Sequence, residues 1–372
     1  MNLIIKYIAL NIAGWWGAVL MQTYMHPSSG DYLPDRELIL QVETDSIRYE
    51  LWLAYDEQGR PEQYVADIFT PVCYSNKCYP VFIDFYWDLL GNFKRYEVPS
   101  GKPLTKLDHI PFEEHDYEKL HEILTNTSSM LRDYRAEDLV VDNQKDLTQG
   151  VDAVTGATLK TLQNEVIGGA VYSCYTLWHL AHGEMAAIAR QHTEEIHDGE
   201  MLIRFLKSQD HRYQYWALEK VFQSKRYIEA RFADPVLAIL RGKNIFIAQN
   251  LLENLPAEML ESRERQEWLW ETYLSSPYRL QLAILDRLEH LDLQPGLIEK
   301  MIDGLENSNA EQKRKIFTVL KSQKDLSKRG QKNLALYLDD NHWRKEVYHV
   351  LSNQRKLDRS VRIELNQTEF EQ

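Results

Sequence analysis

The residues best suited to chemistry are concentrated in one short segment, Asp152-Ala-Val-Thr-Gly-Ala-Thr158. The segment places one carboxylate and two hydroxyl groups around a Gly-Ala pair, whose small side chains leave the backbone accessible. It precedes an apolar stretch without Pro, Thr158–His182, which predicts a long helix. Asp152 or Thr155 can therefore serve as a helix cap by accepting a backbone N–H bond, an interaction worth about 1 kcal/mol.

The same segment resembles the flavin-attachment motif Asp-x-x-Ser/Thr-Gly-Ala-Thr of the FMN-binding domains in subunits of sodium-pumping quinone reductases and Rnf complexes. Every fixed position of that motif is matched, by Asp152, Thr155, Gly156, Ala157 and Thr158. In that family the last Thr is joined to the FMN phosphate through a phosphoester, which a separate flavin transferase forms outside the cytoplasm. The resemblance implies that Thr158 carries covalent FMN and that Asp152 helps present the segment to the transferase.

The residue types suit this attachment. An ester requires a hydroxyl, so position 158 can be Thr or Ser. A helix starting beside Thr158 would direct its positive N-terminal end toward the remaining phosphate charge. Three aromatic residues of the predicted helix, Tyr172, Tyr175 and Trp178, are candidate walls for the isoalloxazine ring.

Other polar clusters give weaker indications. His179 and His182 are spaced to lie on one face of the predicted helix. A closed metal site needs four ligands, so we expect a packed histidine pair there rather than a metal site. Asp108-His109 and Glu113–Asp116 form an acidic cluster that is typical of a solvated helix start. The sequence contains no hydrolase, Walker or dinucleotide-binding motif, so we predict no catalytic residue.

Composition limits the possible classes of protein. The chain has 372 residues, 44% hydrophobic and 27% charged, which indicates a folded protein of more than one domain. Its net charge of −13 argues against nucleic acid and against an anionic membrane surface as the main partner.

The N-terminal residues have the pattern of an export signal. Lys6 is followed by a mainly apolar stretch to Met21, which predicts that residues 1–25 are a signal peptide or a short membrane anchor. A buried N-terminal helix is the alternative. We therefore expect export to the periplasm or cell envelope, where Cys73 and Cys78 can close a small disulfide loop, while Cys174 packs as a small hydrophobe.

Periodicity predicts an α+β domain over residues 31–198. Alternating apolar residues indicate a mainly antiparallel sheet, followed by a helix at Glu113–Leu124, a polar loop at Glu137–Gly150 and the long helix that packs on the sheet. The predicted strands are Glu37–Glu43, Ser46–Leu53, Gln63–Phe69, Pro80–Tyr86 and Phe93–Val98.

Residues 199–372 are predicted to form a second, all-α domain. Short amphipathic segments follow one another with short links, which favours a solenoid of HEAT-like helical repeats over the alternative of a plain helical bundle. The predicted helical segments are Arg212–Gln223, Pro235–Leu240, Ile245–Leu255, Arg265–Leu274, Arg279–Leu288, Leu297–Leu305, Gln312–Leu320, Lys332–Leu338 and Trp343–Leu351.

Together these patterns predict an exported redox accessory protein rather than an enzyme. A flavin tethered at Thr158 would carry electrons, and the helical repeats would dock a protein partner of unknown identity. The alternative is an exported scaffold or binding protein whose flavin-like domain is structural and whose repeats bind the partner.

Overall fold

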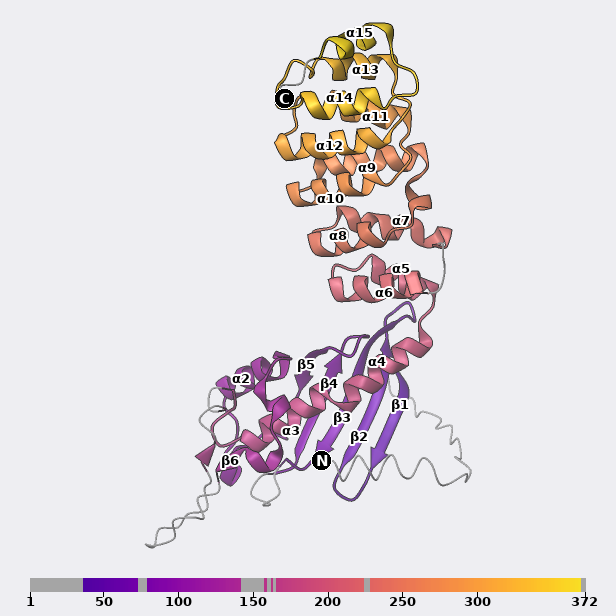
Figure 1. The fold of residues 1–372 in the computed structure, drawn as a ribbon. Coiled ribbons are helices and arrows are strands. Elements are labelled where there is room, and N and C mark those ends of the chain that lie inside the picture. The colour runs from indigo at the N-terminus through magenta and orange to yellow at the C-terminus, as the bar shows by residue number, and fades with distance from the viewer. Residues whose placement is uncertain are drawn as a thin grey trace. The chain divides into compact units, whose positions relative to one another are not determined.

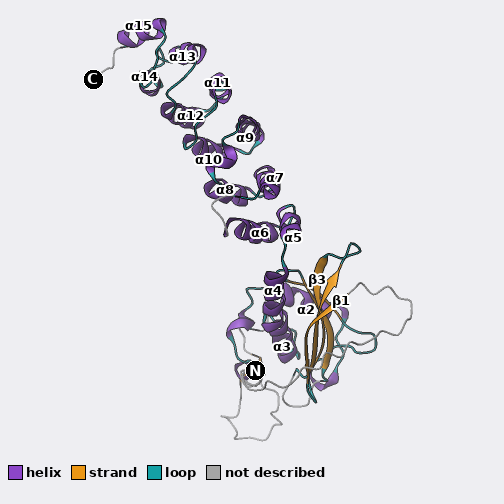
Figure 2. Cartoon of the chain, turned by 90° about the vertical axis from the view of Figure 1, so that its right-hand side faces the viewer, coloured by secondary structure: helices purple, strands orange, loops and turns teal. Residues whose placement is uncertain are grey.

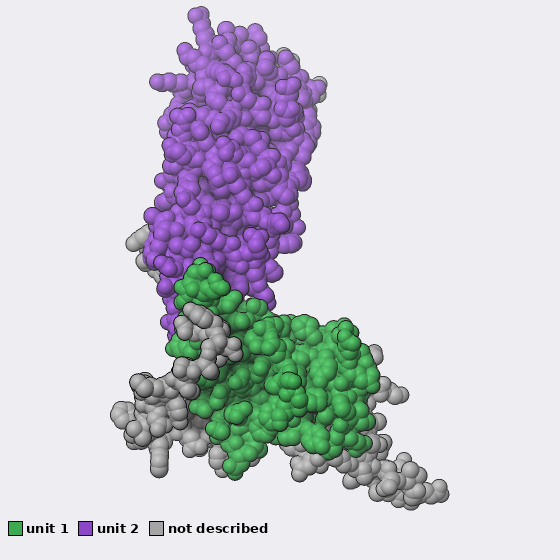
Figure 3. Space-filling model, turned by 180° about the vertical axis from the view of Figure 1, so that it is seen from behind, with its two compact units in different colours: residues 1–191 green, residues 192–372 purple. Residues whose placement is uncertain are grey.

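The structure is a computed structural model that describes residues 36–72, 79–141, 157–158, 162, 165–223 and 228–368 (Figure 1). The chain divides into two compact units, residues 1–191 and 192–372 (Figure 3). Three predicted features lie outside the described residues: the signal peptide or anchor at 1–25, the Cys73–Cys78 pair and the motif residues Asp152–Gly156. Among the helices that the structure describes, none is long and apolar enough to cross a membrane.

Unit 1 contains the antiparallel sheet that the alternating pattern predicts. Its five strands pair in chain order, β1-β2-β3-β4-β5, because each is joined to the next by a short connection. The turn between the first two strands is closed by a hydrogen bond from Thr44 N to Ile47 O at 2.8 Å. The strands are β1 Arg36–Glu43, β2 Arg48–Tyr55, β3 Pro61–Thr70, β4 Val81–Trp87 and β5 Phe93–Glu97.

One face of this sheet forms the core of unit 1. Helix α3, Val171–His182, and the first part of α4, Glu184–Ile196, lie across this face (Figure 2), and α2, Glu114–Thr125, packs beside β5 and α3. Trp87 is fully buried, and its indole N–H donates to the Ala181 carbonyl at 2.7 Å. The alternating residues of the strands thus bury one face against helices, as expected for an α+β domain.

The predicted helix over Thr158–His182 is wrong in its first part. Ala157–Thr158 form strand β7, which pairs antiparallel with β6, Val140–Val141, inside the stretch predicted as a loop. Helix α3 begins only at Val171, after a turn in which Gly169 has φ 77°. A positive φ interrupts a right-handed helix, and Gly adopts it without steric cost, so the Gly-Gly pair separates motif and helix.

Unit 2 is helical along its described residues, which confirms the all-α prediction for this part of the chain. Most predicted segments appear with ends shifted by a few residues, while α5 and α15 had no predicted counterpart. The helices are α5 Gly199–Leu206, α6 His211–Gln223, α7 Ala230–Ala238, α8 Ile245–Asn254, α9 Arg263–Ser275, α10 Tyr278–Glu289, α11 Pro295–Asp303, α12 Ala310–Ser322, α13 Lys328–Ala335, α14 Arg344–Ser352 and α15 Arg359–Gln367. Short 3₁₀ turns accompany both units, at η1 Leu107–His109, η2 Met130–Asp133, η3 Ala136–Asp138, η4 Ile239–Arg241 and η5 Ala257–Leu260.

The helices of unit 2 alternate between two layers (Figure 2). Helices α8, α10, α12 and α14 contact one another in order in one layer, and α9, α11, α13 and α15 do so in the other. The helices of the second layer, starting with α5 and α7, begin at residues 199, 230, 263, 295, 328 and 359, at intervals of 31 to 33 residues. Each helix pair therefore packs mainly on the pairs before and after it.

Buried or half-buried glutamine amides join the loops between successive helix pairs. Gln323 Nε2 donates to Leu291 O at 3.2 Å, and its Oε1 accepts from Leu293 N at 3.3 Å. Gln354 repeats the arrangement one pair later, with bonds to Gln323 O at 2.9 Å and from Leu326 N at 2.8 Å. Because each amide satisfies one donor and one acceptor of a neighbouring loop, the loops are held in register. The amides of this kind are Gln266, Gln323, Gln331 and Gln354.

Candidate functional site

The flavin-like motif is described only at its last two residues. Thr158 lies in β7 and its backbone pairs with that of Val140. Since α3 begins at Val171, Thr158 does not stand at a helix N-terminus, and the expected contribution of the helix dipole to a phosphate is not supported. The N-cap of α3 is Ala170, so the alternative role of Asp152 or Thr155 as a cap of that helix is not supported, and both residues lie outside the described residues.

Residues just before β6 and shortly after β7 belong to the core of unit 1. Leu139 and Leu162 are fully buried. The carboxylate of Glu165 accepts hydrogen bonds from Ser129 Oγ at 2.8 Å and from Met130 N at 3.0 Å. The chain before β6 and after β7 is therefore attached to a folded domain.

The aromatic residues expected as walls for a flavin ring are mostly occupied by packing. Tyr175 and Trp178 are 6% and 4% exposed, and the Trp178 indole donates to Asn126 O at 2.9 Å. Tyr172 is half-buried. The prediction of ring walls is therefore wrong for Tyr175 and Trp178, because α3 turns both side chains into the protein. A Thr hydroxyl suits a phosphoester, whereas these two rings do not fit an isoalloxazine.

The two histidines of α3 are bonded to backbone carbonyls. His179 Nε2 lies 3.0 Å from Leu131 O, and His182 Nε2 lies 2.8 Å from Leu124 O. A carbonyl only accepts, so Nε2 carries the proton in each ring. Burial lowers the pKa of both imidazoles below its usual value. Among the described residues, no group of His, Cys, Asp and Glu is arranged to hold a metal ion.

The acidic cluster at the start of α2 is partly buried rather than fully solvated. Glu113 and Asp116 form a reciprocal capping box, in which the Asp116 carboxylate accepts from Glu113 N at 2.8 Å. Asp116 is 3% exposed and pairs with Lys106 Nζ at 2.8 Å. The helix start was predicted correctly, but the Asp116 carboxylate is buried and paired instead of solvated.

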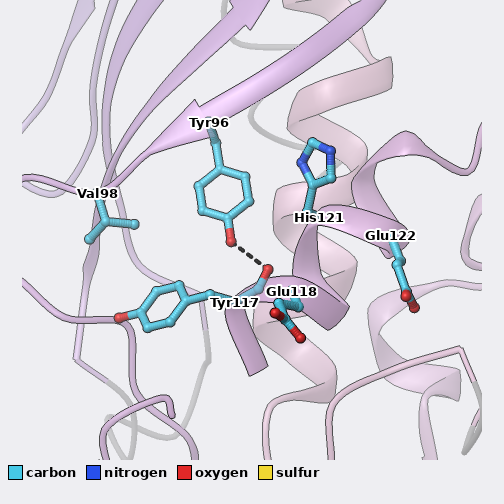
Figure 4. A pocket seen from close by; sticks show the side chains of 6 residues that line it. All are labelled: Tyr96, Val98, Tyr117, Glu118, His121 and Glu122. Atoms are coloured by element: carbon cyan, nitrogen blue, oxygen red, sulfur yellow. Dashed lines mark hydrogen bonds between the residues drawn. The ribbon is translucent and has the colours of Figure 1, made fainter. Parts of the chain in front are cut away.

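An open pocket of about 660 Å³ lies between β5 and α2 (Figure 4). The Tyr96 hydroxyl donates to the Tyr117 carbonyl at 2.7 Å, and the Tyr117 hydroxyl accepts from Leu104 N at 3.2 Å. Both rings are thereby fixed at the pocket wall. The pocket is lined by Tyr96, Val98, Tyr117, Glu118, His121 and Glu122.

The pocket was not predicted from the sequence, although its helical side carried a signal. His121 and Glu122 lie three and four residues after Glu118, which places them on the same face of the predicted helix as Glu118. Glu122 also pairs with Lys119 at 3.3 Å. The lining therefore offers carboxylates, an imidazole and aromatic rings near solvent.

A row of carboxylates crosses the other face of the sheet. The strand register places Glu50 opposite Asp67, Asp67 opposite Asp84, and Asp84 opposite Glu97. Partial burial, and then the charge of Asp67, raise the pKa of Asp84 to about 6. Like charges directly opposite each other destabilise a sheet, so this row of carboxylates lowers the stability of the sheet locally.

Comparison of the chain with protein-family models, with curated proteins and with solved structures returned no match.

Proposed function

We propose that the chain is an exported redox accessory protein that carries FMN on Thr158 through a phosphoester and docks a protein partner through its helical repeats. The observation that carries the proposal is the complete seven-residue motif, whose last residue lies in a strand of a folded α+β unit. When bound, the flavin would supply electron transfer, while the chain supplies its attachment and position.

The strand geometry around Thr158 is compatible with recognition by a flavin transferase. Strands β6 and β7 form a two-stranded sheet, so among the described residues each has one unpaired edge. An enzyme can bind such an edge by adding a strand of its own. In this arrangement the backbone gives affinity and the Thr158 hydroxyl becomes the group that is esterified.

The test is the intact mass of the exported protein, produced with and without a flavin transferase. We expect a gain equal to FMN less one water only when the transferase is present. Thr158→Ala should abolish the gain. Thr161→Ala is the matched control, because it removes the same side chain just outside the motif and should leave the gain unchanged.

An unmodified mass, obtained under conditions in which a known substrate of the transferase is flavinylated, would overturn the flavin assignment. Equal modification of Thr158→Ala would place the flavin on another residue. Thermal unfolding of both variants, compared with wild type, separates loss of the attachment group from loss of folding.

The second candidate function is an exported scaffold whose α+β unit carries no flavin. It is favoured by the two-layered stack of helices, since regular repeats present extended binding surfaces. We propose that this stack is a solenoid. Its spacing of 31 to 33 residues is shorter than the roughly 40–47 residues of HEAT repeats.

The two candidates differ in what Thr158→Ala does in the native host. A flavin carrier loses its function with that change while its abundance stays normal. A scaffold is unaffected by the change but loses function when surface residues of the repeats are altered.

A further inference from the structure

The last four helices of unit 2 differ in charge from the rest of the chain. Residues 310–367, from the start of α12 to the end of α15, contain 14 Lys and Arg against 7 Asp and Glu. The whole chain has 43 Lys and Arg against 56 Asp and Glu. A local excess of seven positive charges in a protein of net charge −13 indicates a surface that attracts anions.

Two loops bring many of these charges to one edge of the stack. The loops that join α12 to α13 and α14 to α15 run side by side, with Asn353 Nδ2 bonded to Lys321 O at 2.9 Å and Arg355 N bonded to Lys324 O at 3.0 Å. The Gln354 amide lies between these two bonds in sequence and joins the same loops. We call the cations of this surface the basic edge: Lys321, Lys324, Lys328, Arg355, Lys356 and Arg359.

The cations of the basic edge are exposed and only partly neutralised. All six side chains belong to exposed residues, and Arg355 pairs with Asp325 at 2.8 Å. Two further carboxylates lie at this edge. The pKa of Asp358 is lowered by its hydrogen bonds with Ser360 and by the charges of Lys332 and Lys328. Glu299 accepts a hydrogen bond from Ser327 Oγ at the start of α13. Six cations therefore face three carboxylates.

Helices α13 and α15 both begin at this edge. Ser327 Oγ accepts from Gly330 N at 2.9 Å, and Asp358 Oδ1 accepts from Ser360 N at 3.0 Å, which caps the two helices. The positive ends of their dipoles thus point to the same surface as the lysine and arginine side chains. Dipoles and side chains favour an anion together.

The sign of the charge reverses along the same edge of the stack. The loop from α8 to α9 carries Glu258 and Glu261, and the loop from α10 to α11 follows Glu289 and contains Asp292. The Gln294 amide bonds to Glu261 O at 3.4 Å, so these loops are neighbours in the row. A partner with one acidic segment can therefore bind only at the C-terminal end of the edge.

We propose that the basic edge binds an extended acidic peptide segment of a partner protein. The two loops expose no large apolar side chain that could enter lipid, which favours a peptide over a membrane surface. Paired loops with cations along them match a linear row of carboxylates. The inference rests on the docking half of the proposed function and names its class of partner, but it does not depend on the flavin.

The test uses full-length protein without transferase treatment and a fluorescein-labelled peptide of alternating Glu and Ser. Fluorescence anisotropy should show binding that weakens as NaCl is raised from about 50 to 300 mM, because exposed charges are screened. The peptide in which Gln replaces Glu should not bind. Lys324→Glu/Lys356→Glu should weaken binding by at least about tenfold. Since no flavin is attached, failure here is distinct from failure of the mass measurement.

The matched control is Lys207→Glu/Lys345→Glu, which changes the charge equally at exposed positions away from the basic edge. It should bind within about twofold of wild type, since its charges lie beyond short-range contact. Equal binding by wild type and Lys324→Glu/Lys356→Glu would overturn the proposal, as would equal binding of the Gln peptide. Co-sedimentation with phosphatidylcholine vesicles only when they contain phosphatidylglycerol, without binding of the acidic peptide, would assign the edge to a membrane instead.

Discussion

The two units differ in the sequence separation of the residues whose contacts stabilise each of them. In unit 1 the Trp87 indole bonds to Ala181, 94 residues away, and Arg190 bonds to Leu90, 100 residues away. In unit 2 the bond between Gln354 and Gln323 spans 31 residues, about one helix pair. Unit 1 must close a long loop before its core forms, whereas unit 2 can build by adding neighbours.

This difference predicts different responses to damage. A destabilising substitution in the core of unit 1 should lower the stability of the whole unit, because the sheet and its covering helices form one core. A destabilising substitution in unit 2 should lower the stability of the adjacent helices and have little effect on more distant ones, as in other stacks stabilised by nearest neighbours.

The largest expected effect is that of Trp87→Ala. It removes a fully buried indole together with its bond to Ala181, and it should cost unit 1 about 3–5 kcal/mol of unfolding free energy. Hydrogen exchange should speed up across β1 to β5 and α3. Trp343→Ala is the counterpart in unit 2, since this side chain is 6% exposed and its ring lies 5.4 Å from that of Phe317.

For Trp343→Ala, faster exchange should be confined to α12–α14 and the helices next to them. If it spread evenly through unit 2, the description as a stack of neighbours would be wrong. Local exchange after Trp87→Ala would equally contradict the single core of unit 1.

The next effect isolates a close approach of backbone in unit 1. Gly59 and Gly91 both have φ 72°, but a methyl group at Gly59 meets open space, whereas at Gly91 it would overlap the Ala186 carbonyl. Ala at either position costs about 1–3 kcal/mol of backbone strain. Gly91→Ala should cost about 1–3 kcal/mol more, since α4 must move. If urea titrations gave equal unfolding midpoints for the two variants, α4 would be able to move away from residue 91 without a loss of unfolding free energy.

A smaller effect is expected from the amide ladder of unit 2. Gln323→Leu leaves Leu291 O and Leu293 N unpaired in a buried loop, which should cost about 1–3 kcal/mol. The exposed Gln367→Leu is the matched control and should be nearly neutral. Hydrogen exchange at Leu293 N reports the lost bond directly, and unchanged protection there would exclude the ladder as a stabilising device.

The smallest effect concerns the carboxylate row and depends on pH. The pKa of Asp84 is raised from 3.8 to about 6, so the folded protein takes up a proton in this range and gains stability as the pH falls through it. Asp67 and Glu97 repel the charged form, while Arg36 stabilises it. Asp84→Asn should therefore raise the melting temperature at about pH 7.5 but not at about pH 4. Glu62→Gln, an exposed change on β3, should show no such pH dependence.

Regular elements could be predicted from the sequence, whereas their interruptions could not. The five strands carry a clear alternation, and helices such as α2 and α12 carry a clear apolar stripe. Strand β7 contains only Ala157–Thr158, and two residues show no periodicity. The apolar stretch that follows was therefore assigned to one helix, although the turn at Gly169 divides it.

The candidate site was predictable only where it is local in sequence. The motif ending at Thr158 can be recognised from seven consecutive residues. The pocket joins Tyr96 of β5 to Tyr117 of α2, and this pairing depends on how α2 packs beside the sheet. Likewise, Gln323 looks like any polar helix end until the neighbouring loop brings Leu291 and Leu293 to its amide.

The even interval between helix starts in unit 2 has a consequence for how such a chain can change its length. Because α9, α11 and α13 begin 32 or 33 residues apart and each contacts the next helix of its layer, the packing of one pair on its neighbour is repeated by the next pair. Duplication of one such stretch would extend the stack without disturbing its ends. Excision of one would bring the acidic and basic loops of the edge closer together. Unequal recombination could therefore change the length of the stack by whole helix pairs.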